Sequence, residues 1–217
     1  MIKTVYTYYE PIDAINNFSS RNHKQEELIE ICAKSWEKNG WEFIVLNYDT
    51  SKEHPSYQIY SGLVKTFPSV NPPPYDYHCY MRWLAMAQVG GGLMIDYDVI
   101  NNSFKNKDSE SLVEQKNLSV LQHNVPCVVY GSSEQYLKVC EKFCELINYP
   151  GCVVNMNNKP HTSDMIMITA GFSKNDINKL RYVVDYPNNG PLIHCSQRFC
   201  SENKKTKLEA MTEVFKL

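Results

Sequence analysis

Two aspartates separated by one residue, Asp96 and Asp98, follow directly after an apolar segment of the chain. In an extended strand, residues i and i+2 project from the same face, so both carboxylates are expected to point together beyond the strand end. Unpaired carboxylates at this spacing repel each other, and a divalent cation would relieve the repulsion. Because hard oxygen ligands suit Mg²⁺ or Mn²⁺, the pair predicts a metal site that also holds phosphate.

The residues around this pair decide between a metal site and an ordinary turn, since most Asp-x-Asp triplets are turns or caps. Gly92 to Ile95 precede the pair, and Val99 and Ile100 follow it. Solvated turns seldom lie inside buried strand sequence of this kind. The surroundings therefore favour a metal site at the carboxyl end of a sheet strand, where open α/β sheets bind ligands.

The composition is that of an ordinary globular domain, with 217 residues, 43% hydrophobic and 21% charged, and a formal net charge of −2. This length predicts a single domain over residues 1–217. The charge offers no basic face, so no nucleic-acid partner is expected. No transmembrane segment is expected either, because no stretch approaches the roughly 20 apolar residues that span a bilayer.

The cysteines and the N-terminus predict the cellular compartment. Eight cysteines include no Cys-x-x-Cys pair, so a zinc site is not expected. The first residues lead into a strand pattern and lack the layout of a signal peptide. Together these features predict reduced thiols in a cytoplasmic protein.

Strand and helix patterns alternate along the chain, which predicts an α/β fold with a mostly parallel central sheet and helices on both faces. Besides the strand before Asp96, strands are expected at 2–8, 41–46, 118–122, 127–130, 165–169, 181–184 and 192–194. Helices are expected at 26–38, 76–89, from Ser132 or Ser133 to 147, and at 204–215. Segments 67–75 and 148–160, rich in Pro, Gly or Asn, are expected to be loops.

The stretch from Arg82 to Val99 resembles the donor-site signature of GT-A glycosyltransferases, which combines an arginine-bearing helix, a glycine turn and an Asp-x-Asp motif. The likeness is to the group with fungal α-mannosyltransferases and the glucosyltransferase domains of large clostridial toxins. Segments 35–43, 163–167 and 191–194 resemble further landmarks, so the likeness covers most of the chain. Two departures are Cys79, where relatives often carry Asp, and three glycines in place of two. The resemblance implies a single GT-A, Rossmann-like domain.

The same resemblance implies a metal-dependent transferase. It would move a sugar from a nucleotide-sugar donor, a UDP-sugar in preference to a GDP-sugar, to a carbohydrate or glycan acceptor, with retention of configuration. Asp98 would bind Mn²⁺ or Mg²⁺ directly, and Asp96 would contact the ribose or a metal-bound water. His194, which ends a Leu-x-His segment, would be a further metal ligand.

Other residues expected at the same site come from separate parts of the chain. The planar guanidinium of Arg82 would bind the donor sugar or the diphosphate. Thr7, Tyr8 and Tyr9 close the first strand at the same edge of the sheet, where a nucleoside base could stack on a ring. Asp164 precedes an apolar segment that is expected to be a strand, and its carboxylate would contact the donor sugar or act in catalysis.

Two other functions fit parts of the pattern. A haloacid-dehalogenase-type phosphatase would use Asp96 as nucleophile and Asp98 as acid–base. That motif normally opens the chain, however, and is usually followed within one or two residues by a threonine that is missing here. The second alternative is a non-catalytic module that binds a nucleotide sugar. Its weakness is that Arg82, both aspartates and His194 are all present.

Overall fold

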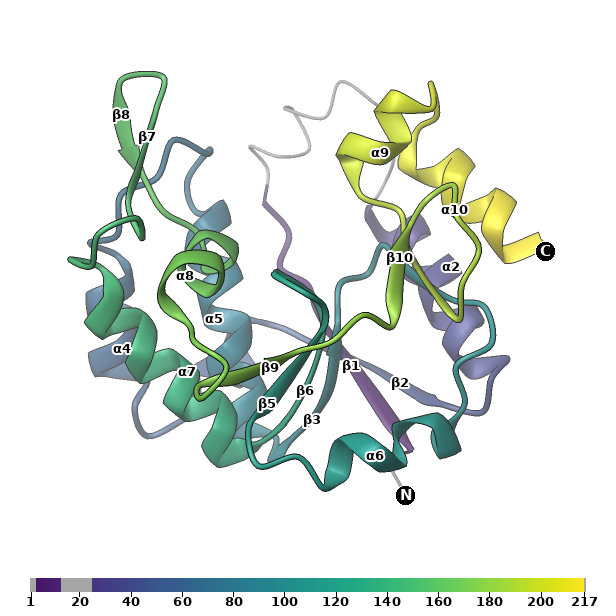
Figure 1. The fold of residues 1–217 in the computed structure, drawn as a ribbon, viewed down its shortest axis with the longest axis horizontal. Coiled ribbons are helices and arrows are strands. Elements are labelled where there is room, and N and C mark those ends of the chain that lie inside the picture. The colour runs from purple at the N-terminus through teal and green to yellow at the C-terminus, as the bar shows by residue number, and fades with distance from the viewer. Residues whose placement is uncertain (1–2, 13–24, 217) are drawn as a thin grey trace.

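A computed structural model describes residues 3–12 and 25–216 of the chain (Figure 1). The strands in this part are β1 (Thr4–Tyr8), β2 (Glu42–Leu46), β3 (Gly91–Ile95), β4 (Val99–Asn101), β5 (Leu118–Gln122), β6 (Val125–Ser132), β7 (Val154–Met156), β8 (Lys159–His161), β9 (Ile177–Lys179), β10 (Val183–Asp185) and β11 (Leu192–His194). The helices are α2 (Gln25–Glu37), α3 (Tyr48–Lys52), α4 (Tyr57–Val64), α5 (Tyr75–Gln88), α6 (Glu110–Val113), α7 (Ser133–Leu146), α8 (Asp164–Gly171), α9 (Gln197–Glu202) and α10 (Lys207–Lys216), with a 3-10 turn at Asn106–Ser109.

The central sheet confirms the predicted α/β class. Among the described residues it has six strands in the order β2-β1-β3-β6-β5-β9. Strand β1 runs parallel to β2 and β3, and β5 runs parallel to β9, whereas β6 is antiparallel to both of its neighbours. Strands β10, β11 and β4 form a second small sheet, and β7 pairs with β8 in a hairpin.

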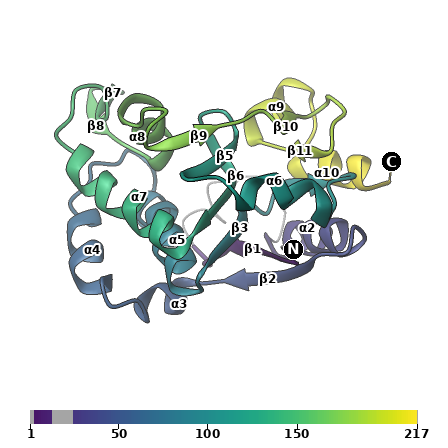
Figure 2. The same cartoon turned by 60° about the horizontal axis from the view of Figure 1, so that its bottom comes forward.

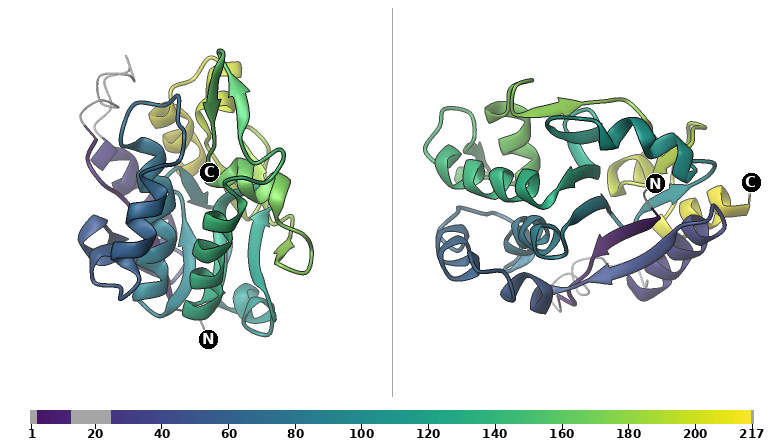
Figure 3. Two further views of the ribbon diagram at one scale, coloured as in Figure 1. Left: turned by 90° about the vertical axis from the view of Figure 1, so that its left-hand side faces the viewer. Right: turned by 90° about the horizontal axis from the view of Figure 1, so that it is seen from below.

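Helices cover both faces of the sheet, as predicted. Helices α4, α5 and α7 lie on one side and α2 and α10 on the other, and the turned views keep these two groups apart (Figures 2 and 3). Along β3 the side chains alternate between the two faces. Met94 belongs to the apolar cluster with α5 and α7, whereas Leu93 and Ile95 belong to the cluster with α2 and α10. The sheet is therefore buried on both sides, as parallel sheets usually are.

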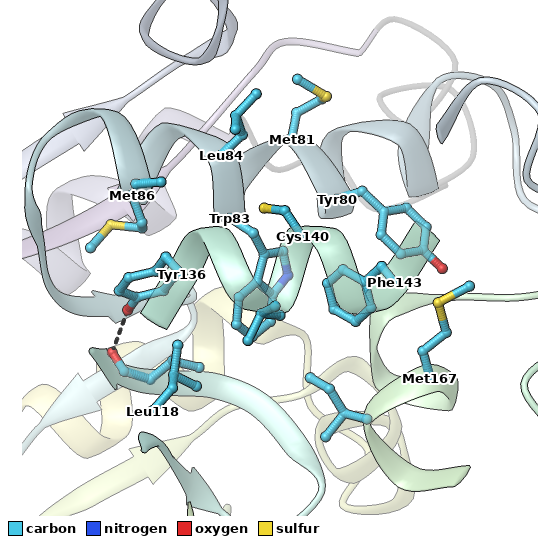
Figure 4. Packing of buried hydrophobic residues seen from close by; sticks show 14 of the residues in the cluster. Tyr80, Met81, Trp83, Leu84, Met86, Leu118, Tyr136, Cys140, Phe143 and Met167 are labelled. Carbon is cyan, nitrogen blue, oxygen red and sulfur yellow. Dashed lines mark hydrogen bonds between the residues drawn. The ribbon is translucent and has the colours of Figure 1, made fainter. Parts of the chain in front are cut away.

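Aromatic rings join α5 to α7 in the first cluster (Figure 4). The ring centroid of Trp83 lies 5.9 Å from that of Tyr136 and 5.5 Å from that of Phe143. The ring of Tyr80 packs edge-on to Phe143 at 5.2 Å. This packing fixes the rotation of α5 and so the direction in which the neighbouring Arg82 projects.

The glycines before β3 are needed because backbone segments approach closely there. Gly91 has a φ of +84°, and a Cβ atom built on it would lie 2.5 Å from the carbonyl oxygen of Gly131. Such a contact is impossible for any side chain, so a glycine is required where β3 begins beside β6.

Two expectations about local structure were wrong. Segment 165–169 is helical within α8, because the Ser163 hydroxyl caps the helix by accepting a hydrogen bond from the Ile166 amide at 3.3 Å. A short apolar run does not by itself distinguish a strand from a helix. Segment 148–160 holds most of the β7–β8 hairpin, whose two-residue turn at Asn157 and Asn158 has φ values of 54° and 60°.

Several predicted boundaries also shift. Helix α10 begins at Lys207 rather than at 204, because Thr206 and Glu209 form a reciprocal cap with backbone bonds of 2.8 and 3.2 Å. Strand β1 begins at Thr4, and Ile2 lies outside the described residues. No helix in the described part of the chain combines the length and the apolar character needed to cross a membrane.

Candidate functional site

A pocket opens where β1 and β3 end, beside α5 and α10. Five predicted site residues line it: Tyr8, Tyr9, Arg82, Asp96 and Asp98. The rest of its lining is Glu10, Ile12, Gln25, Tyr75, His78, Cys79, Ile95, Tyr97 and Lys207. The pocket therefore lies at the carboxyl end of parallel strands, where the sequence placed it.

Asp96 and Asp98 lie in a tight turn and not in an extended strand. Strand β3 ends at Ile95, and the amide of Val99 donates to the carbonyl oxygen of Asp96 at 3.0 Å, so β4 begins directly after the turn. The expectation that both residues share one face of a strand was wrong. The turn still directs both carboxylates to the same place.

Asp96, Asp98 and His194 each offer one ligand atom, and these atoms all lie within 4.8 Å of one another. His194 arrives from far along the chain because β11 pairs with β4, with His194 opposite Val99. Two carboxylates and one imidazole form a donor set that suits Mn²⁺, and Mg²⁺ less well because of the nitrogen. The buried Oδ1 of Asp98 has no hydrogen-bond partner and faces the His194 ring, so a cation could bind between these two side chains.

Both carboxylates have cationic partners, which corrects the assumption that they are unpaired. Arg82 Nη1 pairs with Asp96, and Lys207 Nζ pairs with Oδ2 of Asp98. Asp98 is only 6% exposed. Burial alone would raise the pKa of Asp98, but Lys207 and His194 outweigh burial and hold this pKa well below its usual range. Burial raises the pKa of Asp96, against the opposing effect of Arg82.

A hydrogen bond sets the orientation of the His194 ring. Its Nδ1 lies 2.8 Å from Oε1 of Gln122, and because that oxygen only accepts, Nδ1 carries the proton. Nε2 then faces Oδ1 of Asp98 at 3.4 Å. Burial alone would lower the pKa of His194, but Cys127 and Asp98 outweigh burial and raise it well above its ordinary value. The carbonyl of Gln122 thus selects Nε2 as the nitrogen that can bind a metal.

Arg82 links two carboxylates at the floor of the pocket. Its Nη2 lies 2.7 Å from Oδ2 of Asp164, which also accepts a hydrogen bond from Trp83 Nε1 at 3.1 Å. The other oxygen of Asp164 accepts from the Met165 amide at 2.7 Å. Asp164 is the first residue of α8 and is buried. Both of its carboxylate oxygens therefore accept hydrogen bonds from protein donors. The Nε of Arg82 is buried and has no hydrogen-bond partner.

Aromatic side chains form the wall of the pocket near the end of β1. Tyr9 packs edge-on against Tyr97 with ring centroids 6.1 Å apart, and the hydroxyl of Tyr8 lies 3.1 Å from Nδ1 of His78. Thr7 does not line the pocket. It is fully buried, and its hydroxyl donates to the carbonyl oxygen of Ile95 at 2.9 Å, which ties β1 to β3.

Two residues of the site were missed by the sequence reasoning, Lys207 and Gln122. Lys207 carried a signal, because a lysine in the first turn of a helix opposes the helix dipole and needs a compensating partner. Gln122 carried none, since a glutamine at the end of a strand is unremarkable without the pairing that brings it to His194.

No protein-family model and no curated protein sequence matches the chain. Among solved structures it is similar to a glycosyltransferase involved in the glycosylation of the major capsid of PBCV-1. The two chains are 11% identical, the match covers 100% of each, and the TM-score is 0.49. Any assignment of function therefore depends on the geometry of the site.

Proposed function

We propose that this protein is a metal-dependent glycosyltransferase that moves a sugar from a nucleotide-sugar donor to a carbohydrate or glycan acceptor. The observation that carries the proposal is the cluster of Asp96, Asp98 and His194 within 4.8 Å at the edge of the pocket. The guanidinium of Arg82 and several tyrosines line the same pocket. This combination suits a ligand with a diphosphate, a sugar and a flat base.

Asp98 and His194 would hold Mn²⁺ or Mg²⁺, with Asp98 as the direct carboxylate ligand and Asp96 binding the ribose or a metal-bound water. When bound, such a cation stabilises the negative charge that develops on the leaving diphosphate. Gln122 keeps Nε2 of His194 directed at the cluster. The turn between β3 and β4 keeps both carboxylates close together before any ligand arrives.

Arg82 would contact the donor sugar or the diphosphate. Asp96 and Asp164 hold its guanidinium on two sides, so the planar fork is already oriented when the donor binds. Its Nε–H is buried and has no hydrogen-bond partner in the described part of the chain. Because both oxygens of Asp164 are engaged with protein donors, the contacts favour a positioning role for Asp164 over the direct catalytic role expected from sequence.

Tyr8 and Tyr9 would border the nucleoside base, and the buried Thr7 would act only by tying β1 to β3. We favour a UDP-sugar over a GDP-sugar, and retention of anomeric configuration, on the sequence resemblance alone. The eight cysteines, all in the described part of the chain, are free thiols. This state fits the cytoplasmic setting that we propose.

Thermal unfolding with UDP-sugars and GDP-sugars, each with Mn²⁺ or with EDTA, tests the proposal. Stabilisation by a nucleotide sugar only when Mn²⁺ is present supports it. Release of inorganic phosphate from phosphomonoesters, without a response to nucleotide sugars, would replace it with the phosphatase. Metal-dependent binding with no transfer and no donor hydrolysis would instead indicate a non-catalytic module.

A further inference from the structure

Lys207 occupies a position that the proposed reaction does not yet explain. It is the first residue of α10, it lines the pocket, and its ammonium pairs with Oδ2 of Asp98. We propose that Lys207 is an internal counter-ion that neutralises Asp98 in the metal-free protein, is displaced when a metal binds, and then contacts the diphosphate of the donor. The last step rests on the proposed function, whereas the first two do not.

The ion pair is built into the fold. The side chain of Asp98 is 8% exposed and that of Lys207 is 22% exposed, so water screens their attraction only weakly. The reciprocal cap between Thr206 and Glu209 fixes the start of α10 beside the turn. A lysine here faces the positive end of the helix dipole, which is unfavourable unless an anion compensates. Asp98 supplies that anion.

An ammonium and a divalent cation cannot share Asp98 without strong repulsion. The carboxylate has two oxygens: Lys207 holds Oδ2, and Oδ1 lies 3.4 Å from Nε2 of His194. A cation bound between Asp98 and His194 would lie within a few ångströms of the Lys207 ammonium. At that distance, like charges repel by several kcal/mol even at an effective dielectric of about 20. Binding of metal and pairing with Lys207 therefore compete.

Once displaced, the ammonium needs a new anionic partner in the pocket. Asp96, the other carboxylate of the metal cluster, is already paired with Arg82. The flexible four-carbon stem of a lysine lets its ammonium swing while its backbone stays in α10. A diphosphate bound beside Asp98 would supply such an anion. Lys207 would thus add a positive charge to the leaving group.

The first test measures Mn²⁺ affinity from the electron paramagnetic resonance signal of free Mn²⁺. Lys207→Met should bind Mn²⁺ at least about tenfold more tightly than the wild type, since the competing charge is gone. Lys207→Arg keeps the charge and should remain close to the wild type. Lys205→Met is the matched control, because Lys205 lies two residues away and pairs at 3.0 Å with Glu213 on the surface.

Equal Mn²⁺ affinity in the wild type and in Lys207→Met would overturn the competition. If Lys207→Met does not fold, the wild type still gives an answer through acetylation by an N-hydroxysuccinimide ester, read by mass spectrometry. Mg²⁺ should increase the acetylation rate of Lys207 several-fold while that of Lys205 stays constant. An unchanged rate at Lys207 would contradict its displacement.

The second test compares UDP with uridine at saturating Mn²⁺. Lys207→Met should weaken UDP binding about tenfold and leave uridine binding unchanged, because only UDP carries the diphosphate. Equal affinity of the wild type and Lys207→Met for UDP would contradict the contact between Lys207 and the diphosphate. It would not contradict the competition between Lys207 and the metal for Asp98. If the wild type binds no nucleotide although Lys207→Met binds Mn²⁺ more tightly, the proposed function fails and the counter-ion role stands.

Discussion

The role expected for Asp98 changes once its partners in the structure are known. From the sequence, two neighbouring carboxylates indicated a repulsion that a divalent cation would relieve. In the structure Asp98 is buried and paired with Lys207. The residue therefore contributes to stability as well as to any metal site. Its role as a ligand and its role as an ion-pair partner require different variants to be separated.

Asp98→Ala should destabilise the metal-free protein by about 3 kcal/mol, because it leaves a partly buried ammonium without its partner. Urea unfolding in EDTA measures this change. In the Lys207→Met background the same substitution should be less damaging, since the ammonium of Lys207 is no longer left without its partner. Equal losses in both backgrounds would mean that the ion pair does not stabilise the fold.

The raised pKa of His194 predicts how the affinity for Mn²⁺ changes with pH. This pKa in the metal-free protein is raised well above 6.5, and a metal binds only the neutral ring, so binding must release a proton. Mn²⁺ affinity should rise as the pH rises toward that pKa, by up to about tenfold per unit, and then level off. Metal-dependent activity should therefore be lost on acidification at a higher pH than the ordinary histidine pKa of about 6.5 would give. Titrations of Mn²⁺ between about pH 6 and 9 measure the slope.

A flat profile over this range would contradict the assignment of His194 as a metal ligand. His194→Asn provides the control, since it should bind Mn²⁺ weakly and with little dependence on pH. Without metal the sign of the stability effect is opposite. A raised pKa in the folded state adds stability that is complete below pH 6.5 and is lost as the pH rises through the raised value.

At the scale of elements, the periodicity of apolar residues predicted which segments lie in the core. Local capping decided whether a short apolar segment is a helix or a strand. The strand after the glycines and the helix before them were predicted because their apolar patterns are long and end in clear signals. The segment after Asp164 was misassigned because its apolar run is short and the Ser163 cap was not recognised. The β7–β8 hairpin was missed because its turn uses two asparagines in a polar stretch.

Gly91→Ala should destabilise the protein by more than about 1 kcal/mol, because the residue has a positive φ and no space for a Cβ. Gly62 in α4 is the matched control. It has no atom within 4 Å of a built Cβ, so Gly62→Ala should stabilise the protein by about 0.5–1 kcal/mol. Chemical unfolding of both variants tests the close approach of β3 to β6.

The contact between α5 and α8 predicts how Asp164 acts. Asp164→Asn keeps the shape but weakens the charge-assisted bond to Arg82, so donor affinity should fall about tenfold or more. A retained donor affinity with abolished turnover would instead favour the catalytic role expected from sequence. Titration calorimetry with a UDP-sugar and Mn²⁺, beside the rate of donor turnover, separates the two outcomes.

At the scale of the whole molecule, the site joins residues from the end of β1 to the start of α10. Sequence reasoning identified the site residues that follow or end apolar strand patterns, such as Asp98 and His194. Such residues come together because parallel strands end at the same edge of a sheet. It did not find Lys207, whose partner lies 109 positions earlier in the chain. Such pairings depend on β11 returning beside β4, and no local pattern carries that information.

The most direct test of the central claim is electron–nuclear double resonance on the protein with bound Mn²⁺ and UDP. A metal held by His194 that also binds the diphosphate should show coupling to a ring nitrogen and to phosphorus. His194→Ala should remove the nitrogen coupling, and omission of UDP should remove the phosphorus coupling. A Mn²⁺ signal that remains that of the free hydrated ion, or bound Mn²⁺ without phosphorus coupling, would contradict the account.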